Sequence, residues 1–373
     1  MITNFKPVLL ATGHPHGGIL HFVAALAGAL IKIGRRSCMA FAPQALLNRI
    51  HEVHFCQFHE YHVIDHPWGL NQWKFILQSS YYCWRFKRDY ILHYHLPSLM
   101  PPHIYTAHGL YTRFWLQNPN PGLVAKMQFL LLSAVEKSTI SQSKRVCFVS
   151  EDDRAYAISW LGTDRGDAFQ VINPGVDCNI YKPVRENERR AKREELHSKI
   201  PAEMRWLLFV GNDFERKGLL RVLNSLKARD QTEKYQLFVF GHDKVNQKIA
   251  DEFSAPLGSR VHFFRDDDKL IKTFPLCDIL IMDSAAEGYP LVLLEAMAAG
   301  CVPFTTHFGG VRDAIVHGKN GMVFQCADQV IATALTINEQ ELTRMRFAAR
   351  DFSLQRSWVN VAYDYDKIYS IFD

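Results

Sequence analysis

Two carboxylates lie close together in an otherwise apolar stretch, EGYPLVLLEAMAAGCVP, where Glu287 and Glu295 are separated by seven residues. Pro290 suits the first turn of a helix and Gly300 suits a helix end, so the stretch predicts a helix of about ten residues. Glu295 then lies in the body of this helix and Glu287 in the loop before it. Because a buried carboxylate without a partner is destabilising, both should meet polar groups.

The chemistry that suits this arrangement is recognition of hydroxyl and phosphate groups. The two carboxylates do not share a helical face, which argues against a glycosidase pair flanking a bond. We expect Glu287 to accept hydrogen bonds from sugar hydroxyls and Glu295 to hold ribose hydroxyls. The free N–H groups of Tyr289, Leu291 and Val292 at the helix start should meet sugar or phosphate. In the alternative, Glu295 forms a buried salt bridge or lies on a partly exposed side of the helix, and Glu287 is an ordinary surface residue of the loop.

A second polar loop, GNDFERKG, carries two adjacent cations, Arg216 and Lys217. They stand beside Gly218 at the predicted start of a helix, where a guanidinium fork and a mobile ammonium can both reach a diphosphate. The alternative is an exposed cationic pair, which the helix dipole disfavours at that end unless an anion binds. The loop therefore predicts a diphosphate site.

The loop GHPHGG follows the first apolar run and ends in Gly17 and Gly18. Two glycines at a helix start let the backbone approach a ligand closely, and the free N–H groups there favour an anion. The loop is not G-x-G-x-x-G, and no acidic residue closes the next strand to hold a ribose, so a nicotinamide site is disfavoured. Phosphate or sugar contact is one interpretation and a plain tight turn is the other.

Histidines are concentrated in the first 150 residues, which hold 12 of the 17. The pairs in HPH (14–16) and HYH (93–95) lack a third ligand at metal spacing. Five more lie irregularly spaced in residues 51–66, which is typical of a polar, partly exposed loop, with pH sensing, metal binding or acceptor contact as alternatives. We predict no metal site and no resident cofactor.

The elements that must position these loops alternate between strand and helix twice along the chain. Residues 6–43 read as strand, loop, helix and strand, and the pattern restarts at MRWLLFVG, residues 204–211. Such alternation implies parallel sheets covered on both faces. The predicted fold class is α/β, with two doubly wound, Rossmann-like domains facing across a cleft that both polar loops border.

We place the domain boundary near Pro183. Residues 1–183 then form the first domain and 184–352 the second, and an amphipathic helix occupies 353–373. Within 171–203, Pro and Gly give way to a dense charged run, which predicts a linker followed by a solvated helix.

The positive charge is uneven. Residues 1–150 hold 14 Lys and Arg against 5 Asp and Glu, a balance of +9, although the whole chain carries only +5. Aromatic and cationic residues interleave in YYCWRFKRDY, residues 81–90. Such a face can attract anionic lipid, a phosphorylated acceptor or nucleic acid, and the alternative is a solvated basic surface. We keep the membrane hypothesis for residues 84–88 and do not predict nucleic-acid binding.

Eight cysteines occur without a C-x-x-C pair, which argues against a zinc ribbon or a disulfide framework. The first residues, MITNFKPVLLATG, lack the pattern of a secretory signal, and no apolar run approaches the roughly 20 residues of a spanning helix. We expect a cytoplasmic protein, peripheral at the inner face of the membrane.

Several of these stretches together resemble a known family. EGYPLVLLEAMAAGCVP is similar to the E-x7-E signature of retaining glycosyltransferases of the GT-B fold, family 4. The other matching motifs follow in the family's order along nearly the whole chain: GGI, YTAHGLY, CFVSEDDR, INPGVDCNIYKP, FVGNDFERKG and THFGGVRDAIVHGKNGMVF. FERKG and the short length resemble lipopolysaccharide core and O-antigen enzymes in particular.

The resemblance implies a metal-independent hexosyltransferase that retains anomeric configuration. It places a nucleotide-diphosphate sugar, with UDP-sugar favoured, in the second domain and a glycan or glycolipid acceptor in the first, with the final helix crossing back onto the first. Its implied roles are diphosphate neutralisation by Arg216 and Lys217, ribose binding by Glu295, donor-sugar binding by Glu287, phosphate contact by Gly17 and Gly18, and proximity of His108 to the reacting carbon.

One position departs from the family. Its members commonly carry an arginine directly after the glycine of FVG, where this chain has Asn212. Arg216 supplies a guanidinium from a different backbone position, which leaves phosphate geometry and donor preference open.

Two other classes of function stay open from sequence. One is a nucleotide-sugar epimerase or a phosphorylase, because a fold does not fix a reaction. The other is a non-catalytic, membrane-associated scaffold. Appearance of a transferred product distinguishes the first class, and donor turnover distinguishes the second.

Overall fold

The protein was analysed as a computed structural model, which describes residues 5–13, 17–34, 37–43, 57–60, 68–116, 123–229, 232–241, 249, 252–253, 257–265 and 267–373. Contacts divide the chain into two compact units. Unit 1 comprises Met1–Gly175 and Trp358–Asp373, and unit 2 comprises Val176–Ser357. The sequence placed these divisions near Pro183 and at residue 353.

Unit 1 is built on a seven-stranded parallel sheet in the order β3-β2-β1-β4-β5-β6-β7. Its strands are β1 (Val8–Ala11), β2 (Cys38–Ala42), β3 (Gln57–Glu60), β4 (Ile91–Tyr94), β5 (Ile104–Ala107), β6 (Arg145–Phe148) and β7 (Phe169–Val171). Its helices are α1 (Gly18–Lys32), α3 (Trp68–Phe86), α4 (Tyr111–Leu116), α5 (Leu123–Gln142), α6 (Glu151–Leu161) and α16 (Trp358–Tyr369).

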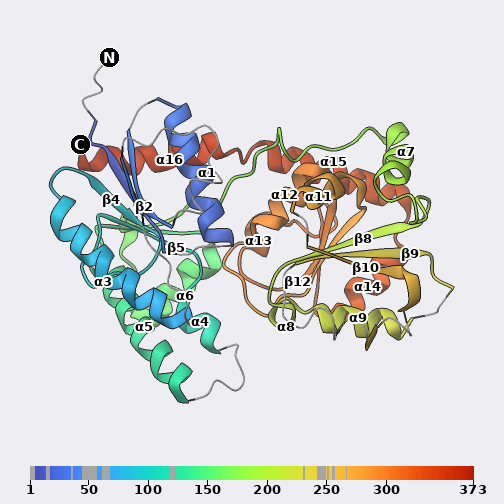
Figure 1. Ribbon diagram of the computed structural model, residues 1–373, viewed down its shortest axis with the longest axis horizontal. Helices are drawn as coiled ribbons and strands as arrows, with labels where there is room; N and C mark the ends of the chain where they lie inside the picture. The colour runs from blue at the N-terminus through green and yellow to red at the C-terminus, as the bar shows by residue number, and fades with distance from the viewer. Residues whose placement is uncertain are drawn as a thin grey trace. The chain divides into compact units, whose positions relative to one another are not determined.

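Helices cover both faces of this sheet, α1 and α16 on one and α3 and α5 on the other (Figure 1). Because successive side chains of a strand point to opposite faces, β4 contributes to both layers. Leu92 and Tyr94 pack with Phe75 of α3 in one buried cluster. His93, between them, lies 2.7 Å from the hydroxyl of Tyr369 in α16. The C-terminal helix is thus part of the core of unit 1.

Unit 2 repeats the architecture with a six-stranded parallel sheet in the order β10-β9-β8-β11-β12-β13. Its strands are β8 (Arg205–Val210), β9 (Tyr235–Phe240), β10 (Val261–Phe264), β11 (Ile279–Met282), β12 (Val302–Thr306) and β13 (Met322–Phe324). Its helices are α7 (Glu186–Leu196), α8 (Phe214–Lys217), α9 (Leu219–Lys227), α11 (Asp267–Thr273), α12 (Leu291–Ala299), α13 (Val311–Ala314), α14 (Ala327–Thr336) and α15 (Glu339–Leu354). Figure 1 shows α9 and α14 on one face of this sheet and α12 and α15 on the other.

The charged helix α7 is largely exposed, as its composition predicted, but two of its arginines are buried. Arg189 and Arg193 are only 5% and 6% exposed. Arg193 donates to the Leu276 carbonyl at 2.7 Å and to the carboxylate of Asp278 at 2.9 Å, and Arg189 lies 3.3 Å from the same carboxylate. Two guanidiniums are buried here because a buried anion and backbone carbonyls receive them, and neither partner is visible in the local charge pattern.

No helix in the described part of the chain combines the length and the hydropathy that crossing a membrane requires.

Candidate functional site

The topology of unit 2 defines where a ligand should bind. From β8 the chain winds outward to β9 and β10, and then returns to place β11 on the other side of β8. In doubly wound sheets, ligands bind at this switch point, outside the carboxyl ends of the two strands. Gly211 follows β8 directly and Asp283 follows β11 directly, so the loops 211–217 and 283–290 meet at that edge.

Ion pairs join these two loops. Lys217 Nζ lies 2.5 Å from Glu287 Oε1, and Arg216 Nη1 lies 3.2 Å from the same oxygen. Arg216 also donates to the Ala286 carbonyl at 2.6 Å and to Asp213 Oδ2 at 2.8 Å. The structure therefore brings together the two cations and the carboxylate that the sequence placed in separate motifs.

The Glu287 side chain is only 11% exposed, and its charge depends on these cations. Burial by itself raises the pKa of the carboxyl, but Lys217 and then Arg216 outweigh it and hold that pKa below its ordinary value. Glu287 is therefore ionised at neutral pH. It fixes the ammonium and the guanidinium at the strand ends, where both can face an anion.

The sequence placed Arg216 and Lys217 beside Gly218 at the start of a helix, and Gly218 is the N-cap of α9. The short helix α8 was not predicted, and the two cations form its last turn. Cations are favoured at the end of a helix, so the dipole of α8 offsets the unfavourable dipole at the start of α9. The pairing with Glu287 is therefore the stronger argument for a site at these cations. Asn212 lies exposed in the loop between β8 and α8.

A second ion pair, which the sequence analysis missed, lies beside the first. Arg221 Nε is 2.5 Å from Asp283 Oδ2, and the Thr306 hydroxyl donates to Asp283 Oδ1 at 2.9 Å. Asp283 is 5% exposed. The available signal was its place, since it is the first charged residue after the apolar strand ILIM. This pair ties the start of α9 to the loop that carries Glu287.

Three glycines permit the close approach of backbone around this loop, and the sequence analysis assigned none of these contacts. A Cβ on Gly218, whose φ is +83°, would lie 2.2 Å from the Asp283 carbonyl oxygen. A Cβ on Gly309 would lie 2.2 Å from the Glu287 carbonyl oxygen, and one on Gly310 would meet the Tyr289 ring at 2.7 Å. Close packing against residues 283–289 therefore depends on glycine at these three positions, because glycine has no Cβ.

Helix α12 begins and ends as predicted, with Pro290 at its N-cap and Gly300, at φ +78°, at its C-cap. Leu291 and Val292 form its first turn, and no side chain caps that turn. Glu295 follows one turn later and is half-buried. The Tyr289 ring is buried, and its hydroxyl has no partner among the described residues. The helix start thus adds N–H donors beside Glu287.

The other predicted residues lie in unit 1, at the carboxyl edge of its own sheet. Gly17, at φ +88°, is the N-cap of α1, and Gly18 is the first residue of that helix. The space around both Cα atoms is open, because an added Cβ would contact nothing within 4 Å. His108 follows β5 directly, and its Nε2 lies 2.8 Å from His95 Nδ1. The structure assigns these residues and the Glu287 cluster to different units.

Glu136 of α5 accepts hydrogen bonds from both ends of the loop that carries His108. Its Oε1 accepts a hydrogen bond from the Tyr105 hydroxyl at 3.0 Å, and its Oε2 accepts one from the Tyr111 N–H at 2.9 Å. These donors lie on either side of residues 108–110. Complete burial raises the pKa of Glu136 to about 8, although both hydrogen bonds act in the opposite direction.

We expect the wild type to lose stability as pH rises, because of Glu136, and the variant Glu136→Gln not to show this loss. Between the ordinary pKa of 4.5 and about 8, folded Glu136 holds a proton that the unfolded chain has released, so the free energy of unfolding falls with pH. Glutamine stays neutral and can still accept from Tyr111 and donate to Tyr105. Urea unfolding at about pH 5 and about pH 8.5 should show the variant gaining at least about 1.4 kcal/mol on the wild type. Identical pH slopes would contradict this.

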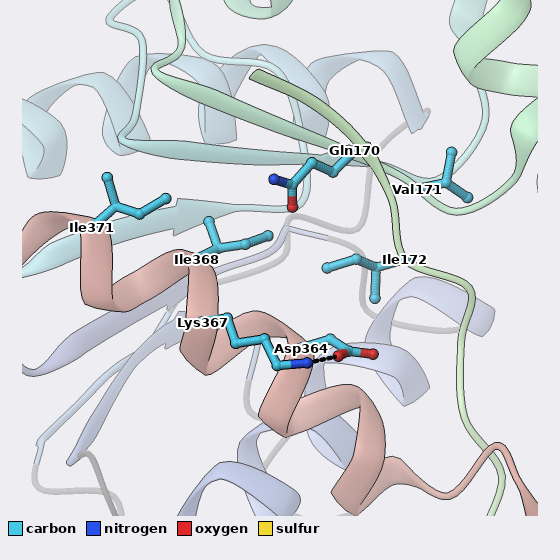
Figure 2. A pocket seen from close by; sticks show the side chains of 7 residues that line it. All are labelled: Gln170, Val171, Ile172, Asp364, Lys367, Ile368 and Ile371. Atoms are coloured by element: carbon cyan, nitrogen blue, oxygen red, sulfur yellow. Dashed lines mark hydrogen bonds and ion pairs between the residues drawn. The ribbon is translucent and has the colours of Figure 1, made fainter. Parts of the chain in front are cut away.

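The described part of the chain also contains a pocket away from all these residues. It has a volume of about 390 Å³ and lies between β7 and the end of α16 in unit 1 (Figure 2). Its lining combines four aliphatic side chains with Gln170 and with the ion pair between Lys367 and Asp364, whose atoms lie 2.8 Å apart, as Figure 2 shows. None of the predicted site residues lines it. We therefore do not assign it to the candidate site.

Metal ligation has no support in the described part of the chain, where no group of three His, Cys, Asp or Glu side chains could hold a metal ion. The HPH motif at 14–16 lies outside the described residues. So does most of the His-rich segment 51–66, of which only the strand 57–60 is described.

Residues 192–350 match the family model described as glycosyl transferases group 1. Among curated relatives, lipopolysaccharide glucosyltransferase WaaG of Escherichia coli is 28% identical over 228 residues, which are 58% of this chain and 59% of that protein. D-inositol 3-phosphate glycosyltransferase of Corynebacterium efficiens is 25% identical over 218 residues, 55% of this chain and 51% of that protein. The chain spans about half the length of the curated relatives it matches.

Solved structures extend the similarity over the whole chain. The crystal structure of WaaG, a glycosyltransferase involved in lipopolysaccharide biosynthesis, superimposes with a TM-score of 0.77 at 21% identity and covers 97% of this chain and 99% of its own. HepE of Anabaena, solved in complex with UDP-glucose, gives 0.71 at 17% identity and covers 98% and 99%. At these identities the match establishes the fold, which is GT-B. The resemblance to GT-B glycosyltransferases that was drawn from the sequence motifs is confirmed.

Proposed function

From the premise that residues 192–350 form a glycosyl transferases group 1 domain within a GT-B fold, we propose that this chain is a retaining glycosyltransferase. It moves a hexose-type sugar from a nucleotide-diphosphate sugar, with UDP-sugar favoured, to a glycan or glycolipid acceptor in the synthesis of bacterial cell-surface polysaccharide or lipopolysaccharide. The observation that carries the proposal is the contact of Lys217 and Arg216 with Glu287 at the switch point of unit 2.

Negative charge grows on the leaving diphosphate as the bond to the sugar breaks. Cations that are already fixed in place lower the barrier most, because they need no reorganisation during the reaction. Glu287 orients Lys217 and Arg216, and the first turn of α12 adds N–H donors without a metal ion. In this proposal, Glu287 also accepts hydrogen bonds from hydroxyls of the donor sugar, and Glu295 from the ribose.

Retention of configuration follows if the acceptor hydroxyl arrives on the face that the diphosphate leaves. The bond from the anomeric carbon to the phosphate oxygen breaks, and the bond from that carbon to the acceptor oxygen forms. The proton of the acceptor hydroxyl passes to the leaving phosphate. This route needs no covalent nucleophile and no protein base.

Release of nucleoside diphosphate from a panel of UDP-, GDP- and ADP-sugars, with a chelator present, tests the proposal. We expect slow hydrolysis of one donor, lowered about tenfold to 100-fold in Glu287→Gln, which keeps the shape of the side chain but loses the charge that holds both cations. Glu215→Gln is a matched control, because Glu215 is exposed on the same short helix as Lys217.

The outcomes distinguish the competing functions. A glycosylated product supports transfer, whereas an isomerised sugar identifies an epimerase and a sugar phosphate identifies a phosphorylase. If no donor turns over with or without a glycolipid acceptor, and no free nucleotide binds in titrations, the non-catalytic scaffold replaces this proposal.

We further propose that the basic N-terminal part of the chain contacts an anionic membrane surface, as a peripheral protein on the cytoplasmic side. Leu77, Tyr81 and Trp84 are 61%, 58% and 62% exposed, and their spacing places them on one face of α3. Exposed Arg85, Lys87 and Arg88 follow at the end of this helix and in the turn after it. Apolar side chains flanked by cations suit the interface of an anionic bilayer.

Neutralising Arg85, Lys87 and Arg88 together to glutamine should weaken binding to phosphatidylglycerol-containing vesicles by roughly 100-fold, at about 1 kcal/mol for each charge. Co-sedimentation with these vesicles, and with phosphatidylcholine alone, measures the effect. The control variant neutralises the exposed Arg185, Arg190 and Lys192 of unit 2, three charges again. Equal binding by the two triple variants would refute this assignment.

A further inference from the structure

Two histidines at the end of β4 have different hydrogen-bonding environments. Both rings of the HYH motif are buried, His93 at 0% and His95 at 1% exposure. His93 uses both nitrogens, since Nδ1 lies 2.7 Å from the Tyr369 hydroxyl and Nε2 lies 2.7 Å from the Thr106 hydroxyl. His95 uses one. Its Nδ1 lies 2.8 Å from His108 Nε2, and its own Nε2 has no partner among the described residues.

Packing fixes the geometry of the His95–His108 pair. The Phe22 ring of α1 meets His108 edge-on, with ring centroids 4.6 Å apart, and lies 5.6 Å from the centroid of His95. The His93 ring is tilted by 36° to the His95 ring, with ring centroids 4.3 Å apart. His95 is enclosed, whereas His108 is partly exposed at the carboxyl edge of the sheet. The pair therefore connects the core of unit 1 to the surface on which ligands of such sheets bind.

One proton lies between the two facing nitrogens, and the surroundings of the two rings determine which nitrogen carries it. Burial, helped by His93 and His108, lowers the pKa of His95 well below its ordinary value, so this ring is neutral and carries a single proton. If His108 donates, that proton must sit on His95 Nε2, as a buried N–H without an acceptor. If His95 donates through Nδ1, its Nε2 carries no proton and is a buried acceptor without a donor. Orphaned buried N–H groups are the rarer of the two in proteins.

We propose that His95 is a positioning residue that donates its Nδ1–H to His108 Nε2 and thereby fixes the orientation and tautomer of His108. A His108 ring with a single proton then carries that proton on Nδ1. Its Nε2 lone pair is occupied, so it does not take the acceptor proton, in agreement with transfer of that proton to the leaving phosphate. Only the link to sugar transfer rests on the proposed function; the tautomer does not.

Nitrogen-15 spectra of the histidine rings test the tautomer directly. In protein labelled at histidine, with His108→Gln used for assignment, we expect a protonated Nδ1 and an unprotonated Nε2 on His108 at neutral pH. In His95→Leu the two tautomers should mix, so both shifts move towards each other. A proton on His108 Nε2 in the wild type, or unchanged His108 shifts in His95→Leu, would overturn the inference.

Two further variants separate positioning from packing. Asparagine places its amide nitrogen near the position of the histidine Nδ1, so His95→Asn should restore the His108 shifts, whereas His95→Gln, whose amide reaches the Nε2 position, should not. His93→Asn is the matched control: it is as buried as His95, it lies two residues away, and it should lower the thermal midpoint without changing the His108 tautomer. Recovery by glutamine and asparagine alike would contradict the proposed geometry. These two variants keep the test decisive if His95→Leu does not fold.

Kinetics provide the link to function. We expect His95→Leu to lower kcat for sugar transfer about tenfold with little change in the KM of the donor, and His95→Asn to recover most of it. The expected tautomer in the wild type, together with no transfer by the wild type or by any variant, would refute the proposed function and leave the His95 assignment standing. A reversed tautomer with normal transfer would refute the His95 assignment and leave the proposed function standing.

Discussion

Lys217→Ala should lower kcat/KM for sugar transfer by about 100-fold to 1000-fold, the loss expected when one preorganised group at a developing anion is removed. Lys217 lies 2.5 Å from Glu287 and is 13% exposed, so its ammonium is held at the strand ends by a buried carboxylate. The variant removes that charge and leaves Glu287 with Arg216 as its remaining cation. Initial rates over a range of donor concentrations measure the effect, once a donor is identified.

Two controls make this result specific. Lys227→Ala removes an exposed lysine from the last turn of the neighbouring helix α9 and should leave kcat/KM unchanged. Lys217→Arg keeps the charge but should not restore activity. The stem of Lys217 runs close to Gly211, where an added Cβ would lie 3.0 Å from its Cγ, and a planar guanidinium does not reproduce the position of an ammonium. Near-normal transfer by Lys217→Ala would exclude Lys217 from charge stabilisation.

Asp278→Ala should reduce the free energy of unfolding by about 3–5 kcal/mol, because it leaves buried guanidiniums without their anion. Asp278 is 6% exposed. It accepts from Arg193 at 2.9 Å and from the Trp206 N–H at 2.7 Å, and Arg189 and Arg346 lie 3.3 and 3.4 Å away. Urea unfolding followed by tryptophan fluorescence measures the loss, since Trp206 lies in the same cluster.

Glu186→Ala is the control for this variant. Glu186 pairs with Arg346 at 3.1 Å, but its side chain is 71% exposed, and exposed pairs contribute about 0–1 kcal/mol. A loss as large as that of Asp278→Ala would show that burial does not explain the difference.

Protonation of Asp278 should reproduce the effect of Asp278→Ala, and this protonation should occur only at low pH. Burial raises the pKa of Asp278, but Arg189 and Arg193 outweigh it, so the pKa in the folded protein lies below the ordinary value of 3.8. A depressed carboxyl pKa contributes stability above the pKa of the unfolded chain, and that contribution is lost as pH falls through the folded value. The difference between wild type and variant should therefore stay constant near neutral pH and shrink below about pH 3.8.

Local signals in the sequence determined the class of the fold and most of the candidate residues. Apolar runs alternating with amphipathic ones predicted two doubly wound sheets, and Pro290 and Gly300 predicted the bounds of α12. These predictions succeeded because periodicity, helix ends and turns depend on neighbours in the chain. The motif order added the GT-B resemblance, and it pointed to Glu287, Arg216 and Lys217 before their contacts were known.

The tertiary structure decided how these residues are partnered. Glu287 lies 70 residues from Lys217 along the chain, and Asp278 lies 85 from Arg193, yet each is an ion pair. No local pattern reports such a contact, so the sequence did not identify Glu287 as the partner of Lys217, and it did not predict that two arginines of α7 are buried. The same reason hid the backbone approach at Gly309 and the pairing of His95 with His108. Composition and spacing identified the chemistry that the chain carries, whereas sheet order brought distant strand ends together and selected the partner of each charge.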